Sequence, residues 1–195
     1  ELPATVAPGP LPPLDPLLPR DGDIDYGLDW GSCLPPGGDA KLALDLEFDA
    51  QAPMQIAADS VQVWPEQEIG EFSGGVVVVR NQARVEADWA RYDRPQQLLD
   101  AEGNIYFEQP GLRLASDNAH FDLGAEQGTL GAVEYRLTDS HARGQAAEAK
   151  LLSREQSRYR DITYSTCRPG QDDWVLQADD LEIDRATGTG KVRRA

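Results

Sequence analysis

The chain has 195 residues and a formal net charge of −16, with 34 acidic against 18 basic side chains. Because binding to a phosphate backbone depends on many basic contacts, this balance excludes nucleic acid as the expected partner. No apolar stretch approaches the roughly 20 residues that a membrane-spanning helix needs. The chain contains 18 glycines and 14 prolines, and few of its segments have helical periodicity, so the composition favours an all-β fold.

The N-terminal segment differs from the rest of the chain. The first 36 residues contain nine of the 14 prolines, and residues 1–50 carry ten acidic side chains against two basic ones, a net charge of −8. This composition predicts an extended or disordered acidic arm without a core of its own. We therefore expect two parts: a flexible Pro-rich arm over residues 1–40, which carries Cys33, and a β domain over residues 41–195.

Five short segments of the β domain resemble one another. In each, an acidic residue follows a small one, and the acidic positions are 29, 29, 31 and 31 residues apart: Ala58-Asp59, Ala87-Asp88, Ser116-Asp117, Ala147-Glu148 and Ala178-Asp179. A short alternating segment follows each pair, often with a glycine and a second apolar run after it. A period near 30 residues with two strands per unit predicts a stacked all-β repeat whose units bury their apolar faces on one another.

Apolar residues alternate with polar ones in the expected strands. Strands with one apolar and one polar face predict two antiparallel sheets that enclose an apolar interior, with open strands at the two ends, residues 45–58 and 174–183. The ordinary role of inward-facing apolar residues is to form a core. The candidates for the interior are Val76, Val78, Val85, Ile105, Phe107, Leu114, Phe121, Val133, Tyr135, Leu137, Ile162 and Tyr164.

The sequence offers no convincing catalytic, cofactor or metal site. His120 and His141 are the two histidines, and neither accompanies a recognisable nucleophile motif, so we expect a solvent-facing or packed role for His120. One carboxylate per repeat is far sparser than in calcium-binding β-rolls. Hydrogen bonding of these carboxylates to backbone amides at a strand entry or bend is the simpler expectation. The chain is therefore predicted to be a non-enzyme without cofactor or metal.

Two cysteines, Cys33 and Cys167, are 134 residues apart, which excludes a CxxC redox or zinc motif. They are either free thiols in a cytosolic protein or structural disulfides in an exported one. The position of Cys33 in the arm, beside Trp30 and two prolines, favours a bonding role. Each cysteine could pair with the other or with a cysteine outside this chain.

Two groups of residues carry a resemblance to a known family. Leu-Asp-Ala-Glu-Gly-Asn-Ile at residues 99–105, with residues 114–122, resembles the repeat unit of the OstA-like lipopolysaccharide-transport family. More specifically, Tyr-Ser-Thr-Cys-Arg-Pro-Gly at residues 164–170, followed by residues 174–178, resembles the cysteine-bearing end of the periplasmic domain in that family's outer-membrane assembly members. Cys33 lies where those members keep another N-terminal cysteine.

The resemblance implies an open, V-shaped antiparallel β-jelly-roll and a periplasmic lipopolysaccharide conduit. Some interior candidates would then line a groove for lipid A acyl chains. The implied partners are lipopolysaccharide, an upstream jelly-roll bridge protein that docks by edge-strand pairing, a C-terminal β-barrel and its plug lipoprotein at the outer membrane. Each cysteine would pair with one in the barrel. Two alternatives stay open: a soluble bridge protein of the same pathway, and a right-handed β-helix enzyme acting on an acidic polysaccharide.

Overall fold

The computed structural model describes residues 54–80, 82–138, 141–167 and 172–195, and the expected arm with Cys33 lies outside them. The described residues form eleven strands and no helix. The strands are β1 (Met54–Ala57), β2 (Ser60–Trp64), β3 (Ile69–Arg80), β4 (Ala83–Asp93), β5 (Leu98–Gln109), β6 (Leu112–Asp122), β7 (Gln127–Leu137), β8 (Ala142–Leu151), β9 (Gln156–Tyr164), β10 (Leu176–Asp184) and β11 (Thr189–Arg193).

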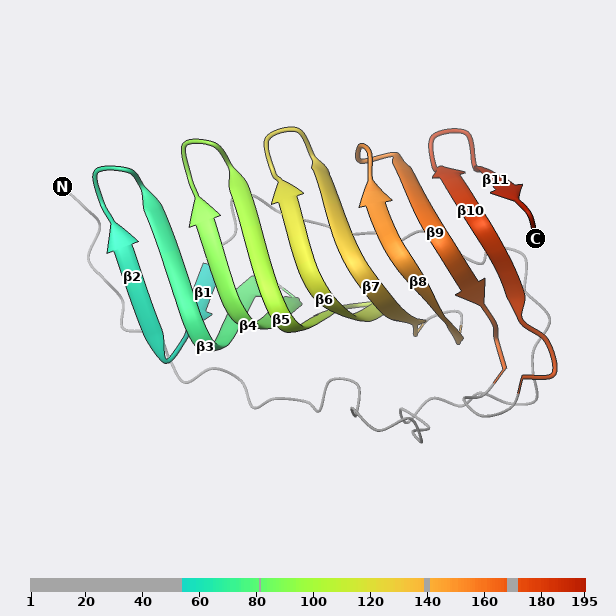
Figure 1. Cartoon of the computed structure of the whole chain (residues 1–195), viewed down its shortest axis with the longest axis horizontal. Helices are drawn as coiled ribbons and strands as arrows, with labels where there is room; N and C mark the ends of the chain where they lie inside the picture. The colour runs from blue at the N-terminus through green and yellow to red at the C-terminus, as the bar shows by residue number, and fades with distance from the viewer. Residues whose placement is uncertain (1–53, 81, 139–140, 168–171) are drawn as a thin grey trace.

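All eleven strands belong to one antiparallel sheet. From β3 to β11 each strand pairs with its neighbours in the chain, and β1 and β2 both pair with β3. Figure 1 shows the strands side by side in chain order, with tight turns between them along the upper rim. The predicted all-β, open antiparallel fold is confirmed. A β-helix, the alternative enzyme scaffold, would require parallel ladders, whereas every ladder between the described strands is antiparallel.

The long strands bend in the middle, and this bend creates the two walls of a trough. Along β6 the buried residues Leu112, Leu114 and Ser116 occupy alternate positions, but the next buried residue is Ala119, three positions on. The same three-residue step separates Leu130 from Val133 on β7. Because the alternation shifts at the bend, both halves of each strand present apolar side chains to the inside. The two predicted sheets are therefore one sheet, and the two halves of its long strands form the two walls.

The recurring acidic residues lie at these bends. Four of the five lie inside β4, β6, β8 and β10, and Asp59 lies between β1 and β2. On the neighbouring strand each bend faces a residue with positive φ, among them Gly103 (φ 73°) opposite Asp88. A Cβ at Gly103 would lie 2.5 Å from the Asp88 carboxylate, which accepts a hydrogen bond from Asn104 Nδ2 at 2.7 Å. The prediction of a bend is right, although Asp88 bonds to a side-chain amide and not to a backbone amide.

The two ends of the sheet match the expected edges only in part. β1 and β2 form the N-terminal edge, within and just beyond the expected residues 45–58. The expected C-terminal edge, residues 174–183, is covered by a further strand, β11, which pairs with β10. That expectation was wrong because residues 189–193 contain one large apolar side chain, Val192, and lack the alternation that marks a strand.

Candidate functional site

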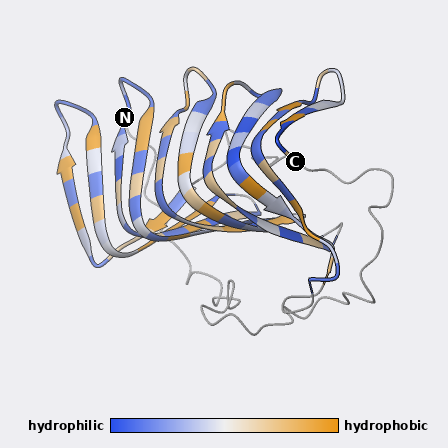
Figure 2. Ribbon diagram, turned by 45° about the vertical axis from the view of Figure 1, so that its right-hand side comes forward, coloured by the Kyte–Doolittle hydropathy of each residue, from blue (hydrophilic) through white to orange (hydrophobic). Residues whose placement is uncertain are grey.

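A row of inward-facing apolar residues crosses every strand of one wall. Each member is the direct cross-strand partner of the next, so the row is continuous from one end of the sheet to the other. In order, the row is Val61, Phe72, Ala90, Ala101, Ala119, Leu130, Ala149, Tyr159, Leu181 and Val192. Figure 2 shows apolar and polar segments alternating along these strands.

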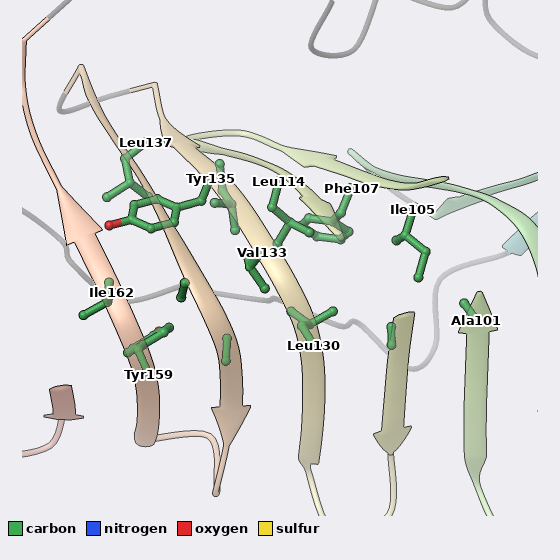
Figure 3. Packing of buried hydrophobic residues seen from close by; sticks show 14 of the residues in the cluster. Ala101, Ile105, Phe107, Leu114, Leu130, Val133, Tyr135, Leu137, Tyr159 and Ile162 are labelled. Atoms are coloured by element: carbon green, nitrogen blue, oxygen red, sulfur yellow. The ribbon is translucent and has the colours of Figure 1, made fainter. Parts of the chain in front are cut away.

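The other wall carries a matching row, in which Ile56, Val78, Val85, Phe107, Leu114 and Tyr135 are successive partners. Figure 3 shows side chains of both walls, among them Leu114, Phe107, Leu130 and Ala101, projecting into the space between them. Leu114 is 1% exposed. The two rows together form one apolar interior that extends along the whole array.

All twelve candidates for the interior lie on its apolar side. Nine are buried, and Val78, Val85 and Phe121 are partly buried and pack against the same cluster. The sequence analysis missed the alanines that contribute much of this surface, Ala90, Ala101, Ala119, Ala142, Ala146 and Ala149. Their small size hides the alternation, and only the cross-strand register reveals that they face the interior.

The interior is closely packed. An apolar cavity of about 10 Å³ lies near the C-terminal end of the trough, between Ile162, Tyr164, Leu176, Leu181 and Val192. Because the inward-facing side chains pack into one buried cluster, a long acyl chain requires separation of the walls or strands to enter. Both ends of the trough are less tightly covered, since Val61, Val63 and Val192 are 55%, 57% and 45% exposed.

One wall has a gap in its strand pairing. β8 and β9 pair along residues 148–151 and 157–160, and beyond the bend they are joined only by an isolated bridge between Arg143 and Ser165. Between these contacts, residues 144–146 pair with β7 and residues 162–164 with β10, but the two segments have no ladder with each other. We call this gap the β8–β9 seam.

Side chains hold the seam together in place of a ladder. Tyr135 Oη, from β7, donates a hydrogen bond to the carbonyl oxygen of Thr163 at 2.7 Å, and the amide of Gln145 donates to Thr163 Oγ1 at 3.1 Å. Gly144 lies directly beneath: a Cβ there would be 1.9 Å from the Thr163 carbonyl and 2.5 Å from Tyr135 Oη. Burial raises the pKa of Tyr135 above its usual range, so the hydroxyl remains a neutral donor.

The segment after β9 anchors the trough to a cysteine. Ser165 Oγ donates to the Trp174 carbonyl at 2.8 Å and accepts from the Cys167 amide at 3.0 Å. Arg143 Nε donates to the Cys167 carbonyl at 2.8 Å. Cys167 is fully buried and disulfide-bonded; Cys33 lies outside the described residues. This network connects Cys167 directly to the β8–β9 seam, and the predicted bonding role of the two cysteines stays a prediction.

The remaining polar features give no sign of catalysis. His120 is exposed and its Nδ1 lies 2.5 Å from Asp100 Oδ1 on the outer face. Within the described residues, no three His, Cys, Asp or Glu side chains are grouped to hold a metal ion. The described part of the chain also contains no helix with the length and apolarity to cross a membrane.

Comparisons with known proteins agree with this architecture. The family described as LptA/(LptD N-terminal domain) LPS transport protein matches residues 55–189. The chain is 33% identical over 150 residues to the LPS-assembly protein LptD of Alkalilimnicola ehrlichii, which covers 77% of this chain and 20% of that protein. The LptD of Methylococcus capsulatus is 30% identical over 145 residues, or 74% of this chain and 14% of that protein. The chain therefore spans one fifth or less of the length of these relatives.

A solved structure is also similar to this chain. LptH, described as the LptA-homologous periplasmic component of the lipopolysaccharide transport device of Pseudomonas aeruginosa, aligns with a TM-score of 0.42 and 13% identity, over 75% of this chain and 98% of that one. The matched family consists of transport proteins, as its description states. This agrees with the prediction that the chain is not an enzyme.

Proposed function

Because the chain belongs to the LptA/LptD N-terminal domain family of lipopolysaccharide transport proteins, we propose that it is a lipopolysaccharide conduit on the periplasmic side of the outer membrane. The acyl chains lie between the two walls of the trough, and the sugars and phosphates remain outside. Lipopolysaccharide enters at the N-terminal end from a bridge protein and leaves at the C-terminal end toward an outer-membrane β-barrel with its plug lipoprotein.

The observation that carries this proposal is the unbroken row of apolar residues from Val61 to Val192. An acyl chain gains about 0.8 kcal/mol for each methylene group that leaves water, and it requires no directional bonds. A continuous apolar strip lets such a chain move along the array with little change in contact area. The strip is therefore suited to transport and not to binding at one fixed position.

Photo-crosslinking at two adjacent positions of β7 tests the proposal. Leu130 faces the interior and Thr129 faces outward. A photo-reactive residue at Leu130, in the chain incubated with purified lipopolysaccharide, should capture the lipid, whereas the same residue at Thr129 should not. Equal labelling at the two positions, or labelling only at Thr129, would contradict an acyl-lined trough.

The N-terminal edge provides a docking strand for the bridge protein. The Asp59 amide donates to the Gly74 carbonyl at 2.8 Å, so by alternation the amides of Val61 and Val63 face β3 and that of Gln62 faces the open edge. We predict that Gln62→Pro abolishes docking of an LptA-type protein, since proline removes this donor and leaves the bonds to β3 intact. Gln62→Ala is the matched control. Docking of Gln62→Pro at the wild-type level, measured by co-purification, would argue against strand pairing here.

A further inference from the structure

The hydroxyl of Tyr164, like that of Ser157, is buried and has no hydrogen-bond partner among the described residues. Tyr164 is 4% exposed, and within the part of the chain that the structure describes no donor or acceptor lies within bonding distance of the hydroxyl oxygen. Burial raises the pKa of Tyr164, so the hydroxyl keeps its proton. A buried donor without an acceptor is costly, and such a group requires an explanation in terms of structure or ligand.

The surroundings of Tyr164 indicate what kind of ligand would supply the acceptor. The ring lines the apolar cavity at the C-terminal end of the trough, together with Ile162, Leu176, Leu181 and Val192. Its other side lies against Trp174, with the ring centroids 5.9 Å apart. The ligand must therefore be mainly apolar and carry one oxygen atom that accepts a hydrogen bond.

The cavity is small, but one of its sides is an exposed edge strand. Val192 comes from β11, whose five residues are all exposed and which pairs only with β10. Leu176 is also 38% exposed. A shift of this edge strand enlarges the cavity without disturbing Tyr164, which is held by the paired residues of β9 and β10.

We propose that Tyr164 forms a subsite for the oxygen-bearing head of an acyl chain at the C-terminal end of the trough, its hydroxyl donating a hydrogen bond to an ester or amide carbonyl. This inference rests on the proposed conduit function and adds a polar contact point to it. The subsite holds the chain in register at the end of the array, where the cargo leaves the domain.

Two brominated probes that differ in their oxygen atoms test this subsite. Methyl 11-bromoundecanoate carries an ester, and 1-bromododecane is a hydrocarbon of similar length. Bromine quenches nearby indole fluorescence, and Trp174 is the reporter, with Trp174→Phe identifying its share of the signal. We expect Tyr164→Phe to weaken binding of the ester about three- to tenfold, as loss of one hydrogen bond implies. Binding of the hydrocarbon should be unchanged. Tyr92→Phe, the same substitution at the other end of the trough, should leave the affinity for both probes unchanged.

The other outcomes have separate meanings. Unchanged ester affinity in Tyr164→Phe would overturn the subsite and leave the conduit intact. An equal loss for both probes would also overturn it, because the ring and not the hydroxyl would then be responsible. If the wild-type chain binds neither probe and also fails to crosslink lipopolysaccharide through Leu130, the conduit function itself is wrong, and the subsite with it.

Discussion

β6–β7 and β8–β9 are both adjacent strand pairs, but different interactions hold them together. β6 and β7 pair on both walls, along residues 112–115 with 134–137 and 118–122 with 127–131. β8 and β9 pair on one wall only, and Tyr135, Thr163 and Gly144 close the seam on the other. Backbone ladders tolerate most side-chain changes, whereas a seam closed by specific side chains depends on each of them. Even conservative substitutions at the seam should therefore lower the free energy of unfolding by more than their small chemical change suggests.

Gly144→Ala should give the largest effect, since the added Cβ would lie 1.9 Å from a backbone carbonyl that cannot move aside. We expect a loss of about 4 kcal/mol or more in the free energy of unfolding, which lies in the range of severe steric mutations. Gly190→Ala is the control, because its Cβ would meet nothing nearer than 3.9 Å. Urea denaturation measures both. A loss of similar size in the two variants would show that the seam is not tightly closed.

Leu114→Ala tests the ladder-bonded region by removing a side chain that is 1% exposed. The cost combines lost burial with a cavity and should be about 2–5 kcal/mol. Leu176→Ala, near the open C-terminal end, removes the same atoms from a side chain that is 38% exposed and should cost clearly less. Comparable losses from the two truncations in urea denaturation would mean that Leu176 is as well packed as Leu114.

Tyr135→Phe tests the hydrogen bond across the β8–β9 seam alone, because it removes one oxygen and keeps the ring. It leaves the part-buried Thr163 carbonyl without this hydrogen bond, which should cost about 1–3 kcal/mol. Hydrogen exchange should speed up in the segment around Gln145, whose amide donates across the seam to Thr163 Oγ1, more than at residues 128–131, which pair with β8 in a ladder. Uniform exchange in both segments would argue against a local role for Tyr135.

The sequence was informative where residues are large and periodic. Phe107, Val133 and Leu137 were identified as interior by alternation alone, and their burial confirms it. Gly144 gave no signal, because the contact that demands glycine comes from Tyr135 and Thr163, which are distant in sequence. The acidic repeats revealed the period but not that the strands continue through them. Whether a strand ends or bends depends on the neighbouring strand, and that information is not local.

The smallest predicted effect concerns the outer face, where an exposed ion pair adds to the backbone ladder between β9 and β10. Arg158 donates two hydrogen bonds to Asp180, at 2.7 and 2.6 Å, and these bonds hold the pKa of Asp180 below its usual value. A carboxyl group whose pKa is lower in the folded state stabilises the fold above its unfolded pKa, near 4, and this contribution is lost as the pH falls through the folded pKa. Asp180→Asn should therefore lower the melting temperature slightly at pH 7, and the difference from wild type should shrink at pH 3. Because the pair is exposed, added salt should reduce the difference as well.

A difference that stays constant between pH 7 and pH 3 would mean that the carboxylate acts through shape and not through charge. In that case β9 and β10 would be joined by their ladder alone, as β6 and β7 are.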